Sequence, residues 1–202
     1  MKWILLFAFA ILVNAPKPKP TVVIQTALGD ITVELEDAKA PETVKNFRRY
    51  VDGGRFKDSR FHRTVTMENQ PDKKIKIEVI QGGTSPEWEK EAFPAIKLER
   101  TRDTGLRHLD GTISMARNGA DTATSDFFIC IGNQPELDFG GKRNPDGQGF
   151  AAFGRVVKGM DVVRKIQMQP AKNQSLNPPI GIKDIRLIRA KRKLSDDDGG
   201  RK

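Results

Sequence analysis

Apolar and polar residues alternate over a segment near the start of the chain. In residues 30–35, isoleucine, valine and leucine alternate with aspartate, threonine and glutamate, and this period of two is typical of a strand with one buried face. Residues 21–25 form a second run rich in β-branched side chains, and Gly29-Asp30 lies between the two runs. The pattern predicts a β-hairpin.

Further segments of the chain have the same strand character. Short apolar or alternating runs occupy residues 61–65, 75–80, 113–116, 127–131, 150–157 and 182–189. The polar residues 68–74 predict a loop between the first two of these runs.

Two segments have helical spacing instead. Val44, Phe47 and Val51 repeat on one face of a helix that ends at Gly53-Gly54, and residues 159–166 predict a second, shorter helix. Seven or eight short strands with only two helices predict a mainly β protein, organised as a closed antiparallel barrel.

The beginning of the chain has a different composition. Lys2 precedes eleven unbroken apolar residues, 3–13, and Ala15 follows at a position that suits signal peptidase. Residues 1–15 are therefore predicted to be a secretory signal peptide, and the protein is expected in the periplasm or outside the cell. Eleven apolar residues are too few to span a bilayer, which needs roughly 20, so we expect no membrane span. Residues 16–20 form a Pro/Lys leader that is expected to be mobile.

Composition and charge change this picture little. The 202 residues have a formal net charge of +9, with 37% hydrophobic and 30% charged residues, as in a soluble globular domain with its own core. Basic residues are spread along the chain without interleaved aromatic residues, so we expect no nucleic-acid partner. Residues 191–202 form a charged tail that is expected to be disordered. A single domain over residues 21–190 is expected to be a monomer.

The single cysteine excludes an intrachain disulfide. Cys130 lies in the apolar run 127–131, where a buried thiol acting as a small hydrophobic group is expected. No cofactor or metal site is predicted.

Two motifs carry candidate chemistry. Phe61-His62-Arg63 begins one stretch that closes with Ile80-Gln81-Gly82-Gly83, and residues 111–117 with residues 125–129 form a second stretch. Together they resemble the signature of a cyclophilin-type peptidyl-prolyl cis-trans isomerase, of an exported, bacterial-like kind. The resemblance covers residues 21–190. It implies an eight-stranded barrel with a helix capping each end, and an active site in a groove on the outer surface.

The implied reaction needs neither a nucleophile nor a proton transfer. Rotation about a peptide bond has a barrier of about 18–20 kcal/mol, because amide resonance is lost. In the twisted state the prolyl nitrogen carries a localised lone pair. The Arg63 guanidinium, a permanently charged fork of donors, can donate to that nitrogen, and Gln81 would contact the substrate backbone beside the proline. His62 is therefore not needed as a base and is expected to be at most a wall of the site or a hydrogen-bond partner.

The resemblance also implies a pocket for the pyrrolidine ring. Phe61, Phe128 and Leu137 are expected to form this pocket, with Phe127 facing inward. Ala116 and Arg117 are expected along the groove, where the Ala116 backbone would pair with the extended peptide. His108, in a loop, is given no role.

Four positions depart from the best-known pattern of the family. Asp126 stands where glutamine is common and Arg117 where many eukaryotic members have asparagine. Phe150 aligns with a pocket histidine. Glu136 stands where those members often have a tryptophan that contacts cyclosporin, so weak cyclosporin binding at most is expected.

Two functions remain open from the sequence. The first is an isomerase that speeds the folding of exported proteins by acting on their proline-containing segments. The alternative is a binding module or holdase chaperone that recognises such segments with little turnover. Retention of both Arg63 and Gln81 favours the first, because a pure binder could lose the arginine.

Overall fold

The computed structural model describes residues 18–188. The predicted signal peptide, part of the leader and the charged tail lie outside these residues. The strands are β1 Thr21–Thr26, β2 Gly29–Leu35, β3 Ser59–Val65, β4 Val79–Gly83, β5 Thr112–Met115, β6 Phe127–Cys130, β7 Ala151–Lys158, β8 Ala171–Lys172 and β9 Ser175–Ile188. The helices are α1 Pro41–Asp52, α2 Thr101–Thr104 and α3 Met160–Gln167, with short 3-10 turns at Pro86–Glu91 and Pro135–Leu137.

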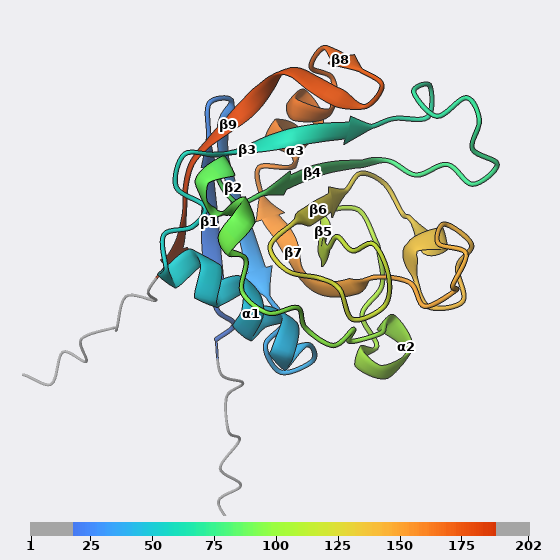
Figure 1. Ribbon diagram of the computed structural model, residues 1–202, viewed down its shortest axis with the longest axis horizontal. Coiled ribbons are helices and arrows are strands. Elements are labelled where there is room, and N and C mark those ends of the chain that lie inside the picture. Colours follow the sequence, from blue (N-terminus) through green and yellow to red (C-terminus); the bar gives the residue numbers. More distant parts are fainter. Residues whose placement is uncertain (1–17, 189–202) are drawn as a thin grey trace, which may run out of the picture.

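Eight of the strands form a closed antiparallel barrel (Figure 1). Their order is β1-β2-β7-β5-β6-β4-β3-β9, and β1 also pairs with β9, which closes the sheet. The two-residue strand β8 only forms a hairpin with β9. The predicted mainly β barrel and its opening hairpin are confirmed.

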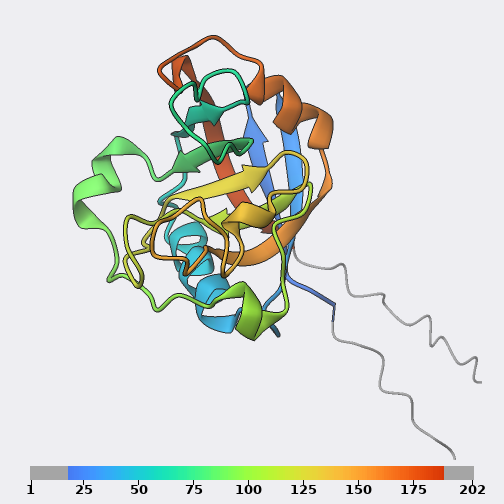
Figure 2. The same cartoon turned by 90° about the vertical axis from the view of Figure 1, so that its right-hand side faces the viewer.

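Helices α1 and α3 cover opposite ends of the barrel (Figures 1 and 2). Phe47 of α1 packs among Phe56, Phe127 and Phe153, with ring centroids 5.1–5.6 Å apart. The α3 side chains Val162, Val163 and Ile166 are buried on the other side. Two capping helices were expected, and the structure adds a third, the single turn α2, in a segment whose sequence has no helical periodicity.

Residues 75–78 were predicted as part of a strand, and this prediction is wrong. Strand β4 begins only at Val79. The buried Gln70 side chain takes the place of a partner strand, because its amide nitrogen donates to the Ile77 carbonyl (2.8 Å) and its oxygen accepts from the Ile77 N–H (3.3 Å). The segment is thus held by a side chain while the loop 66–78 projects from the barrel (Figure 1).

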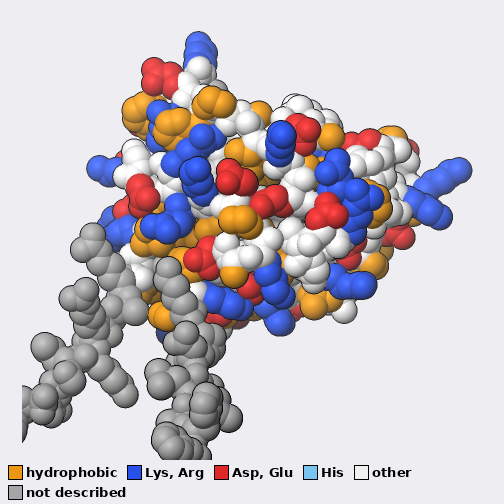
Figure 3. Space-filling model, turned by 90° about the horizontal axis from the view of Figure 1, so that it is seen from below, with side chains coloured by type: hydrophobic (Ala, Val, Ile, Leu, Met, Phe, Trp, Pro, Cys, Tyr) orange, Lys and Arg blue, Asp and Glu red, His pale blue; other side chains and the backbone are white. Residues whose placement is uncertain are grey.

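Charge is mixed over one face of the molecule. On the face seen in Figure 3, Lys and Arg side chains lie among Asp and Glu side chains. Among residues 18–188, no helix is long and apolar enough to cross a membrane.

Candidate active site

Arg63 reaches the outside of the barrel because β3 is irregular. Residues two apart on a regular strand share a face, but the register of β3 with both β4 and β9 shifts between Phe61 and Arg63. Such a bulge turns the following side chain to the other face. Phe61 is fully buried in the barrel core, 5.8 Å from the ring of Phe127. The prediction that Phe61 contributes to the proline pocket is therefore wrong.

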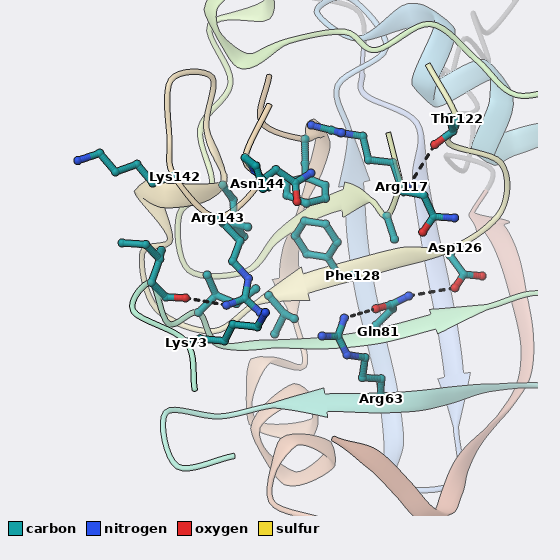
Figure 4. A pocket seen from close by; sticks show the side chains of 18 of the residues that line it. Arg63, Lys73, Gln81, Arg117, Thr122, Asp126, Phe128, Lys142, Arg143 and Asn144 are labelled. Atoms are coloured by element: carbon teal, nitrogen blue, oxygen red, sulfur yellow. Dashed lines mark hydrogen bonds between the residues drawn. The ribbon is translucent and has the colours of Figure 1, made fainter. Parts of the chain in front are cut away.

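Two amide side chains hold the Arg63 guanidinium, and Figure 4 shows the one of Gln81. Its Nη1 donates to Gln81 Oε1 at 2.9 Å, and its Nε and Nη2 donate to Gln174 Oε1 at 3.1 and 2.6 Å. Burial lowers the pKa of the Arg63 guanidinium below its usual range, and a guanidinium stays charged at neutral pH even so. The guanidinium therefore keeps its positive charge and is held in one orientation.

Asp126 sets the orientation of the Gln81 amide. The Gln81 nitrogen donates to Asp126 Oδ2 at 3.0 Å. Since a carboxylate only accepts hydrogen bonds, it turns the amide nitrogen toward itself and leaves the amide oxygen facing Arg63. Gly83 makes room for this carboxylate, because a Cβ there would lie 2.0 Å from Asp126 Oδ1.

Gln174 was missed by the sequence analysis. It lies in the turn between β8 and β9 with a positive φ of 72°, and its nitrogen donates to the Asn69 carbonyl at 3.1 Å. It is 111 residues from Arg63 along the chain. The sequence contains no local motif that joins the two residues.

An apolar pocket lies next to this polar row, outside the barrel. Strand β6 sends Phe127 and Ile129 inward, whereas Phe128 and Cys130 face outward into a second apolar cluster. The buried members of that cluster are Val65, Ile77, Val79, Phe128, Cys130 and Leu137. Ala116 and Phe150 pack against them. The structure thus brings Phe128, Leu137, Ala116 and Phe150 together as expected. Ile77 and Val79, which had no predicted role, contribute to the pocket where Phe61 was expected.

A buried histidine supports the pocket from behind. His108 stacks on Phe128 with centroids 5.9 Å apart and an interplanar angle of 16°. Its Nδ1 lies 2.7 Å from Asp138 Oδ1 and its Nε2 lies 2.9 Å from Ser114 Oγ. Donation from Nδ1 to the carboxylate leaves Nε2 to accept from the hydroxyl. His108 therefore fixes the Phe128 ring, a role that its loop position in the sequence did not indicate.

The remaining predicted residues lie at the margin. The Arg117 guanidinium donates to Asp146 at 2.8 and 3.0 Å and to the Gly149 carbonyl. These bonds lower the pKa of Asp146 and hold the loop 139–149 rather than leave Arg117 free.

The His62 Nε2 lies 3.6 Å from Asp126 Oδ2, and His62 does not line the groove. Cys130 is fully buried in the second apolar cluster, which confirms its predicted role as a buried apolar group, and this burial raises the pKa of its thiol well above the usual value.

Arg63, Gln81, Asp126 and the side chains of the apolar pocket border one open groove of about 720 Å³. Strands β3, β4 and β6 form its floor, and the loops 66–78 and 139–149 form walls at one end (Figure 4). Within residues 18–188, no group of side chains is suited to hold a metal ion. The groove offers hydrogen-bond donors beside an apolar recess.

The groove lies on the outside of a closed antiparallel barrel and places charged and amide side chains beside an apolar recess. The family model for cyclophilin type peptidyl-prolyl cis-trans isomerases matches residues 21–187, and the chain belongs to this family. It is therefore a peptidyl-prolyl cis-trans isomerase, which acts on proline-containing peptides.

Known proteins agree with this assignment. The chain is 38% identical over 176 residues to peptidyl-prolyl cis-trans isomerase A of Dickeya dadantii, covering 83% of this chain and 84% of the relative. It is 33% identical to peptidyl-prolyl cis-trans isomerase B of Escherichia coli, covering 81% and 94%. The crystal structure of a cyclophilin type isomerase of Cryptosporidium parvum has the same fold, with a TM-score of 0.68, 24% identity, and coverage of 85% of this chain and 99% of that one.

Proposed function

We propose that this isomerase accelerates X–Pro rotation in exported proteins, with Arg63 as the catalytic donor and Gln81 as its partner. The observation that carries the site assignment is the Arg63 guanidinium, held by the amide oxygens of Gln81 and Gln174 beside the pocket of Phe128 and Leu137. The lysine-led apolar segment and Ala15 at the start of the chain support export.

The proposed mechanism is selective binding of the twisted amide. The pyrrolidine ring enters the pocket and is held while the preceding carbonyl rotates. As resonance is lost, the prolyl nitrogen becomes a hydrogen-bond acceptor, and Arg63 donates to it. The planar amide of the ground state offers no such lone pair, so this bond lowers the barrier and adds little to substrate affinity. A rate gain of 10⁵ requires roughly 7 kcal/mol of such selective stabilisation.

A binding module with little turnover is the alternative function. Such a protein would need the apolar pocket but would not need a half-buried guanidinium held in one direction by two amides. Line-shape or exchange measurements by NMR on a short Ala-Pro peptide separate the two functions. An isomerase broadens the cis and trans signals at substoichiometric concentration, and a holdase only shifts them on binding.

Export predicts a processed chain. Mass spectrometry of the protein isolated from its host should find a chain that begins at Pro16 or within a few residues of it. The same preparation should accelerate the proline-limited refolding phase of a secreted protein. Recovery of intact Met1 in the exported fraction would contradict the proposal of a cleaved signal peptide.

Cyclosporin is expected to bind weakly. The Glu136 carboxylate lies beside the groove wall, where it accepts a hydrogen bond from the Lys142 N–H at 2.8 Å, so this position offers an apolar ligand no aromatic surface. Titration calorimetry should give a dissociation constant well above the nanomolar range, and Glu136→Trp should recover part of the affinity. Nanomolar inhibition of the unmodified protein would refute this expectation.

A further inference from the structure

One end of the groove is a wall of cationic side chains. It is built by two loops that lie side by side, residues 66–78 and residues 139–149 (Figures 1 and 4). Lys73 and Lys74 come from the first loop, and Lys142 and Arg143 from the second. We call these four residues the basic wall. The other end of the groove carries Asp126, the single carboxylate among the side chains that line it.

Arg143 ties the two loops together. Its Nη1 donates to Gln70 Oε1 at 2.9 Å and to the Ile75 carbonyl at 2.6 Å. Gln70 is 2% exposed and also bonds to the backbone of Thr66 and Ile77. These bonds join the two loops to each other and brace the loop 66–78 from within.

The basic wall has no carboxylate partner within residues 18–188. No ion pair is formed by Lys73, Lys74, Lys142 or Arg143. Arg117 in the same groove differs, because Asp146 neutralises it. The nearby Glu136 carboxylate accepts from the backbone of Lys142 and does not line the groove.

Two half-buried guanidiniums reinforce this excess of charge. Arg143 and Arg63 both point toward the space beside Phe128 (Figure 4). Burial, and secondly the positive charge of Arg63, lower the pKa of Arg143. Two like charges that face one cavity without an anion between them favour a ligand that brings an anion.

We propose that the basic wall makes the enzyme selective for peptides with a carboxylate side chain within about three residues of the proline. The preference applies to the peptide segment, before or after the proline, that lies over the basic wall. A bound proline in the apolar pocket leaves the flanking residues over the two ends of the groove. Because the basic wall lies at one end of the groove only, the enzyme distinguishes a peptide with an acidic residue on one side of the proline from the same peptide with that residue on the other. This inference rests on the proposed function of the groove.

Matched peptides test the proposal. In a neutral X–Pro hexapeptide, Glu or its neutral isostere Gln is placed two residues before the proline or two residues after it, and kcat/KM is measured by NMR exchange. We expect Glu to exceed Gln by roughly five-fold at one of the two positions only, the size expected for two or three exposed charge pairs. The preference should shrink as salt is raised from about 20 mM to about 500 mM, because exposed charges are screened.

A triple variant and a control of equal charge complete the experiment. Lys73→Gln, Lys74→Gln and Lys142→Gln together should abolish the Glu preference, so that the Glu and Gln peptides have equal kcat/KM. Lys45→Gln, Lys158→Gln and Lys183→Gln together remove the same charge from exposed positions outside the groove and should leave the preference intact. Equal rates for Glu and Gln at both positions, or loss of the preference in the control, would overturn the proposal.

Failure of the proposed function gives a different result. An enzyme that isomerises none of the peptides, the Gln peptides included, would refute isomerisation by this groove. Peptide affinities measured on the same series would then still decide the charge preference, because binding to the basic wall does not require turnover.

Discussion

Arg63→Ala is expected to lower kcat/KM for an X–Pro peptide by roughly 100- to 1,000-fold, while peptide affinity changes by less than about three-fold. The reason is the geometry of the donor. The guanidinium is held by Gln81 and Gln174 in one direction, and its bond to the prolyl nitrogen exists only when the amide is twisted. Single-turnover exchange by NMR and binding by titration calorimetry measure the two quantities separately.

Related variants check which property of Arg63 matters. Arg63→Lys keeps the charge but loses the planar fork that meets two amide oxygens, so it should remain badly impaired. Gln174→Ala should lose activity in part, because Arg63 loses two of its three side-chain bonds. Gln81→Ala should likewise lower kcat/KM less than Arg63→Ala does.

His62→Gln should have only a mild effect on kcat/KM, and the rate should not follow a histidine titration between about pH 5 and 8. Near wild-type turnover in Arg63→Ala with an inactive His62→Gln would return the histidine to the centre of the mechanism.

Alanine substitutions of two adjacent phenylalanines are expected to have different effects, one on stability and the other on substrate binding. Phe127 is fully buried in the barrel core and lies against the rings of Phe47, Phe56 and Phe61. Phe127→Ala should lower the free energy of unfolding by about 3–5 kcal/mol through the lost contacts and the cavity. Phe128 faces the groove, so Phe128→Ala should chiefly raise KM and weaken peptide binding through the loss of pocket surface.

Urea denaturation with kinetics on the folded fraction distinguishes the two variants. Phe127→Ala should retain near wild-type kcat/KM below its shifted midpoint. Phe128→Ala should lose activity while still fully folded. The assignment of one ring to the core and the other to the pocket would be wrong if both variants lost stability and activity in the same proportion.

Periodicity predicted most of the barrel but not the site geometry. The hairpin at residues 21–35 and helix α1 follow from local pattern alone, because each buries one face. The inward turn of Phe61 depends on a bulge in β3, and a bulge is decided by the partner strands. An alternating pattern at residues 75–78 likewise predicted a strand, yet no strand pairs with it and the Gln70 side chain satisfies its backbone instead.

Residues distant in sequence complete the site. Gln174 and His108 act on Arg63 and Phe128 from segments that lie next to them only after the barrel closes. Family resemblance named the residues that would face the peptide. The residues that hold those side chains in place have ordinary polar types in loops and turns, so their roles became visible only in three dimensions.

Closure of the barrel by its first and last strands constrains how the chain can acquire its structure. β1 pairs with β9 from Thr21↔Ile188 onward. The first strand to be synthesised therefore cannot complete its pairing until the last strand has been made. Until then β1 and β3 each lack a neighbour and expose an open edge, which is a template for association with other chains. Such long-range pairing also implies a high contact order and slow folding. Cooperative closure is thus a property of the completed chain, and a polypeptide arrested before β9 would have the groove residues of β3, β4 and β6 but neither a sealed barrel nor the turn that brings Gln174 to Arg63.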